Sequence, residues 1–158
     1  TGLGNGAEEA AHPLGPLPVR IFLDANILFS AAWSDGAVRQ LLRLARAAGH
    51  ECWIDAYVET EARRNLQAKS PGSLAAFNAL VGDCRRAPVQ PLSAGLDDAL
   101  SLLPPDDRLV LAAAIRLRCG ALVTGDKRDF APLLGKRVRG VAVHSPAPFY
   151  IAELRGKR

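Results

Sequence analysis

Four acidic residues stand where a parallel α/β sheet would present them to a ligand. Asp24 follows the apolar run of residues 19–23, and Asp126 follows a second apolar run. Asp107 begins a mostly apolar helical segment, and Glu61 lies on the shoulder of an amphipathic one. Parallel strand ends and the helices that follow them meet at one edge of a sheet, where such folds bind ligands. We therefore expect the four carboxylates to converge.

Converging carboxylates define the chemistry of such a site. They repel one another and raise one another's pKa values unless a cation is present. Hard oxygen ligands of this kind suit Mg²⁺ or Mn²⁺, with water and substrate phosphate completing the coordination. A single Asp24 could equally end its strand or cap the next segment. Because three further acids are expected beside Asp24, we favour a metal-dependent site that acts on a phosphodiester.

Neighbouring acids compete for two of the four positions. Asp106 could replace Asp107 or cap its helix, and Glu59 could replace Glu61, although we expect Glu59 on a different side of the helix. Asp129 could add a fifth acid, but a solvated loop residue is the expectation at this position. The three histidines are isolated from one another, so we expect surface or hydrogen-bonded residues and no metal ligand among them.

The hydrophobic pattern predicts the elements that position these acids. Apolar runs rich in strand-favouring residues predict strands at 19–23, 52–54, 121–124 and 138–143, with a peripheral one at 87–89. The segment between Asp24 and Ser34 is expected to be a loop. Strands that alternate with helices predict βαβ units, an α/β fold and a mainly parallel sheet. The predicted helices cover about 34–49, 56–67, 73–82, 96–103, 106–118, 130–134 and 148–154.

Length and composition indicate one compact domain. The chain has 158 residues, 49% of them apolar, which is enough for a single core. Residues 1–18 are rich in Gly and Pro and are expected to be a flexible leader, with residues 19–158 as the domain. No apolar run approaches the roughly 20 residues that cross a bilayer, so we expect a cytoplasmic protein. Cys52, Cys84 and Cys119 lack disulfide or zinc spacing and are expected to be reduced core residues.

The basic balance of the chain favours a polyanionic partner. The formal net charge is +4 and the pI is about 9.3. Two basic pairs stand close in sequence to two of the four acids and could hold the phosphates of a nucleic acid without reading its bases. Trp33 and Tyr57 are the only aromatic residues expected near the site, so no base preference is predicted. The candidate phosphate contacts are Arg63, Arg64, Lys127 and Arg128.

Four motifs give the chain a resemblance to a known family. They are L-D-A-N-I-L around Asp24, E-A-R-R-N-L from Glu61, D-R-L-V-L-A-A-A from Asp107 and V-T-G-D-K-R-D-F around Asp126. In this order they resemble the motifs of PIN-domain ribonucleases, and in particular the VapC-like toxins of bacterial toxin-antitoxin pairs. The resemblance covers residues 19–143, nearly the whole globular part.

The resemblance implies a fold, an activity and partners. The implied fold is a three-layer α/β/α sandwich, PIN-like and Rossmann-like, around a central and mainly parallel sheet. The implied site holds Mg²⁺ or Mn²⁺ on the same four acids, with Asn26 and Thr124 as supporting polar residues. The implied activity is an endoribonuclease, in which the metal activates water and one carboxylate accepts its proton. RNA and a cognate antitoxin are the implied partners, and homodimers are common in the family.

Two other interpretations fit part of the pattern. A PIN-like RNA-binding or assembly module would keep the acids without catalysis. A phosphatase of the haloacid-dehalogenase type would use Asp24 as nucleophile, but that family expects a second Asp where this chain has Asn26. A covalent aspartyl phosphate would distinguish the phosphatase, because metal-dependent hydrolysis by attack of water forms none.

Overall fold

The computed structural model of the protein describes residues 18–91 and 98–155, so the expected leader lies almost wholly outside the described residues. Within the described part the strands are β2 (Arg20–Leu23), β3 (Glu51–Asp55), β4 (Arg85–Ala87), β5 (Ala121–Val123), β6 (Arg137–Val138) and β7 (Val141–His144). They form one sheet in the order β4-β3-β2-β5-β7-β6. Every neighbouring pair is parallel except β6 and β7. The prediction of a mainly parallel sheet is confirmed.

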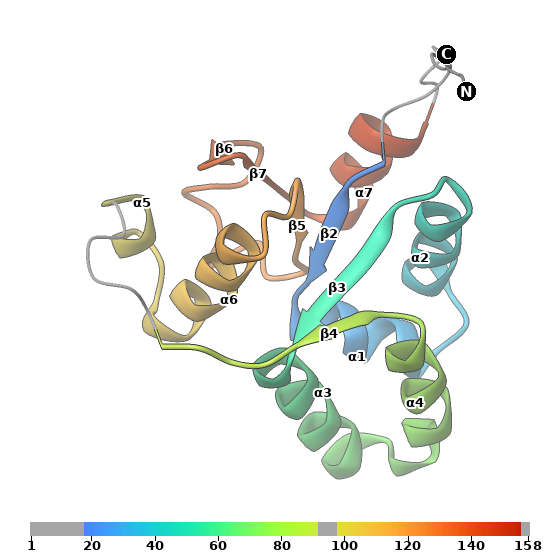
Figure 1. Ribbon diagram of the computed structural model, residues 1–158. Helices are drawn as coiled ribbons and strands as arrows, with labels where there is room; N and C mark the ends of the chain where they lie inside the picture. Colours follow the sequence, from blue (N-terminus) through green and yellow to red (C-terminus); the bar gives the residue numbers. More distant parts are fainter. Residues whose placement is uncertain (1–17, 92–97, 156–158) are drawn as a thin grey trace.

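Helices cover both faces of this sheet (Figure 1). The first four helices contact one another on one side, and α6 packs against β5 on the other. This arrangement confirms the predicted α/β/α sandwich. Among the described helices, none is long and apolar enough to cross a membrane. The helices are α1 (Ala25–Trp33), α2 (Ala37–Ala47), α3 (Ala56–Lys69), α4 (Leu74–Gly82), α5 (Asp98–Ser101), α6 (Pro105–Arg116) and α7 (Pro146–Phe149), followed by a π-helical turn over Tyr150–Leu154.

The two central strands, β2 and β5, form a rigid base for the candidate site. After the exposed Arg20, both strands are apolar throughout, as expected where helices cover both faces of a sheet. Phe22, Leu23 and Leu122 are fully buried, and burial of each such side chain contributes about 1.5–3 kcal/mol. The register pairs Leu23 with Val123, so the residues that follow the two strands leave the sheet side by side.

The prediction of a loop between Asp24 and Ser34 is wrong, because this segment is helix α1. The Asp24 carboxylate caps the helix by accepting a hydrogen bond from Ala25 N at 2.8 Å. The segment is apolar on most of its circumference, so it shows little of the alternation that marks an amphipathic helix. Its buried residues are Ala25, Ile27, Leu28, Ala31 and Ala32.

Three further elements differ from the predictions. Residues 130–134 form turns and no helix. The strand predicted at 138–143 is a hairpin of β6 and β7, because Arg139 and Gly140 adopt positive φ angles of 48° and 85° and reverse the chain. Strand β4 lies two residues earlier than predicted, since Pro88 has no N–H group to extend the ladder. The helix predicted at 96–103 begins outside the described residues, and α5 is the part that the structure describes.

The cysteines and the buried histidine have structural environments. Cys52 and Cys119 are buried as predicted, while Cys84 is half-buried. Burial raises the pKa of Cys52 to about 11 and that of Cys119 to about 12, so both remain thiols at neutral pH. His50 is buried, and its Nδ1 accepts a hydrogen bond from Val19 N at 3.0 Å. This bond ties the start of the sheet to the loop before β3.

Candidate active site

The centre of the candidate site lies at the ends of two adjacent strands, β2 and β5. The chain continues from β2 toward β3 on one side and from β5 toward β7 on the other, so the sheet reverses its order between them. Ligands of open α/β sheets bind at such a reversal. Asp24 N donates to Val123 O at 3.1 Å, and Thr124 Oγ1 donates to Asp24 Oδ2 at 2.7 Å. Asp24 is thus fixed by main chain and side chain together.

The Asp24 carboxylate is buried, with only 5% of the residue exposed. Burial raises its pKa, and the negative charge of Asp126 raises it further. Hydrogen bonds from Thr124, Ala25 and Asn26 act in the opposite direction and favour the ionised form. The positive end of the α1 dipole also favours the charge. The site therefore holds a carboxylate in one orientation with an incompletely balanced negative charge.

The loop after β5 is tied to α1 by the two polar residues that the family resemblance singled out. Asn26 Oδ1 accepts a hydrogen bond from Gly125 N at 2.7 Å, and Thr124 Oγ1 accepts one from Asp126 N at 3.1 Å. A Cβ atom at Gly125 would lie 3.1 Å from Asn26 Oδ1, so glycine permits this close approach. Thr124 and Asn26 therefore place Asp126 relative to Asp24.

Thr124→Val tests this arrangement, because valine keeps the shape of threonine and removes the hydroxyl. The change leaves Asp24 Oδ2 without its 2.7 Å donor and Asp126 N without its acceptor. We expect divalent-metal affinity to fall about 10- to 100-fold, the usual effect of removing a group that orients a metal ligand. Isothermal titration with Mn²⁺ measures the loss. Thr124→Ser keeps the hydroxyl and should retain most of the affinity; equal losses in the two variants would contradict the orienting role.

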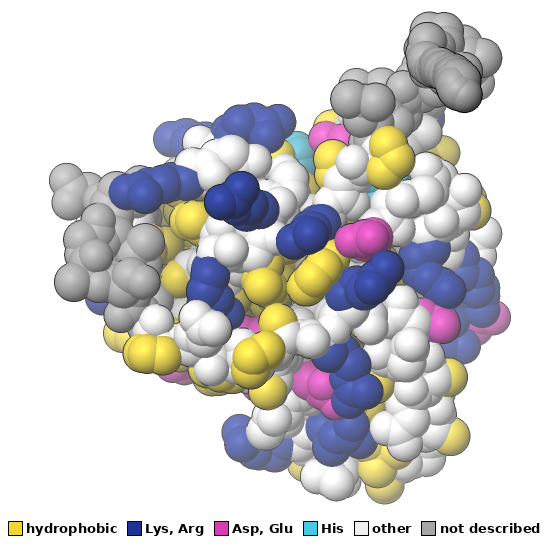
Figure 2. Space-filling model, viewed as in Figure 1, with side chains coloured by type: hydrophobic (Ala, Val, Ile, Leu, Met, Phe, Trp, Pro, Cys, Tyr) yellow, Lys and Arg dark blue, Asp and Glu magenta, His cyan; other side chains and the backbone are white. Residues whose placement is uncertain are grey.

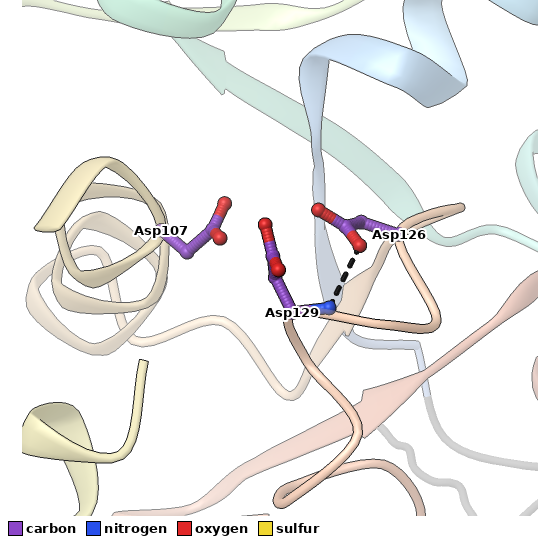
Figure 3. Close-up of side chains that lie close together, drawn as sticks. All are labelled: Asp107, Asp126 and Asp129. Atoms are coloured by element: carbon purple, nitrogen blue, oxygen red, sulfur yellow. Dashed lines mark hydrogen bonds between the residues drawn. The ribbon is translucent and has the colours of Figure 1, made fainter. Parts of the chain in front are cut away.

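Three carboxylates lie close together in the pocket that Asp24 also lines, and Figure 3 shows the three. Asp107 projects from the first turn of α6, while Asp126 and Asp129 come from the loop after β5. Each offers an oxygen atom, and these atoms all lie within 4.8 Å of one another. Asp129 N donates to Asp126 Oδ1 at 2.9 Å, which folds the loop back on itself. Asp129 is half-buried within this group, so its position favours the alternative that it adds a fifth acid.

The negative charge of the cluster is poorly compensated by the protein. In the described part of the chain, no Lys or Arg side chain forms an ion pair within 4.0 Å of Asp107 or Asp126. Burial, followed by the charges of Asp24, Asp126 and Asp129, raises the pKa of Asp107 from 3.8 to about 7. Such a cluster binds protons or cations strongly.

All four predicted acids line one pocket of about 400 Å³. Glu61 stands on the α3 wall, apart from the cluster of Asp107, Asp126 and Asp129. Burial, followed by the charges of Asp24 and Asp106, raises the pKa of Glu61 above its usual value. The structure thus brings the predicted acids together in one cavity, and the charge of Asp24 acts on both Glu61 and Asp107.

Sequence reasoning missed two residues of the same α3 wall. Asn65 and Lys69 line the pocket one and two helical turns after Glu61. Residues four apart share a helix face, so the spacing from Glu61 was the signal that could have found them. Asp106 is exposed and also lines the pocket rim, whereas only Asp107 joins the carboxylate cluster.

The structure places Glu59 and Arg63 away from this pocket. Arg86 Nη2 donates to Glu59 Oε2 at 2.6 Å, and Arg63 Nη2 donates to the same oxygen at 3.1 Å. Hydrogen bonds from Arg86, more than those from Arg63, hold the pKa of Glu59 below its usual range. Arg63 also donates to Asn78 and lies 4.8 Å from the centroid of the Phe77 ring. Both residues join α3 to α4 and β4, so Arg63 does not face the acids.

The other three predicted phosphate contacts are exposed. Arg64 lines a second pocket of about 470 Å³, which shares Glu61, Asn65 and Asp106 with the acidic one. Lys127 and Arg128 follow Asp126 in the loop after β5. Arg128 Nε lies 3.8 Å from Asp129 Oδ1, a weak surface contact. None of the three lines the acidic pocket itself, so they do not neutralise its centre.

The fold and the site together define a three-layer α/β protein with acids at the reversal point of its sheet. A family model described as "PIN domain" matches residues 20–128, more than half of the chain. The chain belongs to the PIN domain family. The matched region contains all four acids that the sequence motifs singled out, and the predicted family resemblance is confirmed.

Solved structures share the fold at low sequence identity. The crystal structure of VapBC2 from Rickettsia felis bound to a DNA fragment from their promoter has a TM-score of 0.62 and 15% identity, and the match covers 80% of this chain and 98% of that one. The crystal structure of DNA-bound VapBC from Salmonella typhimurium has a TM-score of 0.56 and 14% identity, with the same coverage. Identities this low establish a common fold. No curated protein sequence matches the chain.

Proposed function

We propose that the protein is a metal-dependent endoribonuclease that hydrolyses RNA phosphodiester bonds, and that it is the toxin of a toxin-antitoxin pair. The convergence of Asp24, Glu61, Asp107 and Asp126 in one pocket, with Asp129 added, is the observation that carries the proposal. Membership of the PIN domain family supports it. The proposal of an antitoxin partner is supported by the fold shared with VapBC proteins.

The donor atoms of the pocket fit Mg²⁺ or Mn²⁺. Asp107, Asp126 and Asp129 offer hard oxygen atoms within 4.8 Å of one another, and their negative charge is poorly compensated. Asp24 faces this cluster from the end of β2, close enough for its charge to raise the pKa of Asp107. We assign Asp24, Asp107, Asp126 and Asp129 to the ion. In this ligand set Asp129 takes the place of Glu61, which the family resemblance implied as a ligand. When bound, it supplies Lewis acidity that activates water and neutralises charge on the leaving oxygen.

The remaining residues of the pocket have distinct parts in the proposed reaction. Thr124 and Asn26 hold Asp24 and the loop of Asp126 in place through the hydrogen bonds described above. Glu61 stands outside the carboxylate cluster and has a raised pKa. A carboxylate that is free of the ion and holds a proton more readily than usual is suited to accept the proton of the attacking water. We assign that role to Glu61.

Exposed cations around the pocket would hold the RNA backbone. Figure 2 shows Lys and Arg side chains spread over the face that carries β4. Arg64→Ala, Lys127→Ala and Arg128→Ala should each weaken binding of unrelated RNA sequences to a similar degree and flatten the salt dependence of binding. Fluorescence anisotropy over a series of KCl concentrations measures both. Lys136→Ala, at another exposed lysine, serves as a control. An unchanged salt dependence in all three variants would show that these residues do not contact RNA phosphates.

Cleavage of a mixed panel of single-stranded and structured RNA tests the proposed function directly. We expect cutting with Mg²⁺ or Mn²⁺, none with EDTA, and recovery when metal is restored. DNA strands of matching sequence show whether the site prefers RNA. Cutting that persists in EDTA would contradict the metal-dependent mechanism. Metal binding without cleavage of any substrate would favour a binding module over a nuclease.

A further inference from the structure

The acidic pocket continues along α1 and α3 beyond the acids. Helix α1 presents Phe29 and Ser30 to the pocket, and α3 presents Asn65 and Lys69 opposite them. Lys69 follows Glu61 by eight residues, which is about 12 Å along the helix. This end of the pocket therefore lies beside the acids and can contact a part of the substrate that does not react.

An aromatic pair lies at this end of the pocket: Phe29 lines the pocket, and Trp33 lies next to Phe29. The ring centroids of Phe29 and Trp33 lie 6.0 Å apart with planes tilted by 42°. Trp33 is 62% exposed, although it ends a helix whose other large apolar residues pack against the core. An indole this exposed contributes little to folding, because burial is the source of apolar stabilisation. Its position next to Phe29 makes it available to a ligand.

Lys69 adds a positive charge to the aromatic pair. Its Nζ lies 5.8 Å from the centroid of the Phe29 ring. It is the one basic residue among the described residues that line the acidic pocket, yet within the described chain it forms no ion pair within 4.0 Å of an acid. The ammonium group is therefore placed beside the aromatic pair and remains available to an anion.

We propose that Phe29, Trp33 and Lys69 form a platform for single-stranded nucleic acid beside the reaction site. An unpaired base stacks on the aromatic pair, and Lys69 binds a neighbouring phosphate. Aromatic side chains next to cations bind single strands in this way, whereas the bases of a duplex are already stacked on each other. The inference rests on the proposed nuclease function and specifies its substrate as a single-stranded segment that extends along α1 and α3.

Trp33 fluorescence reports on the platform without any need for cleavage. The chain has two tryptophans, so the variant Trp53→Phe leaves Trp33 as the sole reporter. In EDTA, we expect a short single-stranded RNA to quench this fluorescence in a saturable way, and a duplex of the same sequence to do so weakly. By anisotropy, Trp33→Ala should reduce the affinity for the labelled single strand about tenfold. Lys69→Gln should reduce both the affinity and its salt dependence.

A second aromatic residue provides the matched control. Tyr150 is 37% exposed and does not line the acidic pocket, so Tyr150→Ala should leave RNA affinity unchanged. Equal affinity of Trp33→Ala and the parent protein would overturn the platform, and so would a parent protein that binds no single strand. If Trp33 instead binds a partner protein, Trp33→Ala and the parent protein should bind RNA with equal affinity.

Kinetic measurements separate this inference from the proposed function. With metal present, Trp33→Ala should raise the KM for single-stranded RNA about tenfold and change kcat little, since the stacked base does not react. If RNA is cut and Trp33→Ala leaves KM unchanged, the nuclease stands and the platform is wrong. If binding depends on Trp33 but no RNA is cut, the platform stands and the nuclease is wrong.

Discussion

Asp24→Asn is expected to reduce RNA cleavage by more than about 100-fold, because loss of a group that only orients a metal ligand already costs 10- to 100-fold. The substitution should leave the fold intact. Asparagine caps helices as well as aspartate does, so the bond from Ala25 N is kept. Burial raises the pKa of Asp24, and a neutral amide avoids the cost of burying its charge. We therefore expect an inactive protein with an undiminished melting temperature in EDTA.

Asp35→Asn is the matched control for this experiment. It changes the charge by the same amount at an exposed residue that pairs with Arg43 at 2.9 Å, outside the acidic pocket. Cleavage rates with saturating Mg²⁺ and thermal melts in EDTA should be measured for both variants. Full activity of Asp24→Asn would show that the reaction does not take place in the acidic pocket. Loss of the folded state would show that the fold requires the Asp24 carboxylate itself, which also accepts the hydrogen bond from Thr124 Oγ1 at 2.7 Å.

The centre of the site was predictable because strand order and strand ends impose it. A parallel sheet brings the residues that follow its neighbouring strands together, so apolar runs that end in Asp24 and Asp126 are sufficient to place both. The same rule, with the start of a buried helix, placed Asp107. Helix α1 was not predicted, because it is buried on most of its faces and its sequence lacks the alternation of apolar and polar residues that marks an amphipathic helix.

The parts of the site that escaped prediction depend on contacts between distant residues or on turn geometry. Asp129 joins the carboxylates because its own N–H bonds to Asp126 and folds the loop back. Arg63 stood close to Glu61 in sequence, but Asn78 and Phe77 of the next helix hold it on another face. Sequence spacing gives the face of a helix, and the neighbouring elements decide what that face meets.

The stability of the metal-free protein should depend on the ionisation of Asp107. Its pKa is raised from 3.8 to about 7, so the folded state holds this proton more tightly than the unfolded chain does. That contribution to stability is complete below about pH 4 and is lost as the pH rises through about 7. Asp107→Asn keeps a neutral group at every pH. Its melting temperature in EDTA should therefore exceed that of the parent protein by an amount that grows from pH 4 to pH 8.

At pH 8, metal should make the parent protein melt at a higher temperature than Asp107→Asn, which is the reverse of their order in EDTA. Asp107 is only half-buried, so we expect a stability gain of about 1 kcal/mol for Asp107→Asn in EDTA, or about 2–4 °C. Saturating Mg²⁺ or Mn²⁺ stabilises the parent protein by mass action and should do little for a variant that has lost a ligand. Burial lowers the pKa of His50 and His144, so their contribution to stability increases as the pH rises. Both proteins share this contribution, and it cancels in the difference between their melting temperatures. A constant difference from pH 4 to 8 would contradict the raised pKa of Asp107. Equal stabilisation of both proteins by metal would show that Asp107 is not part of the ion's ligand set.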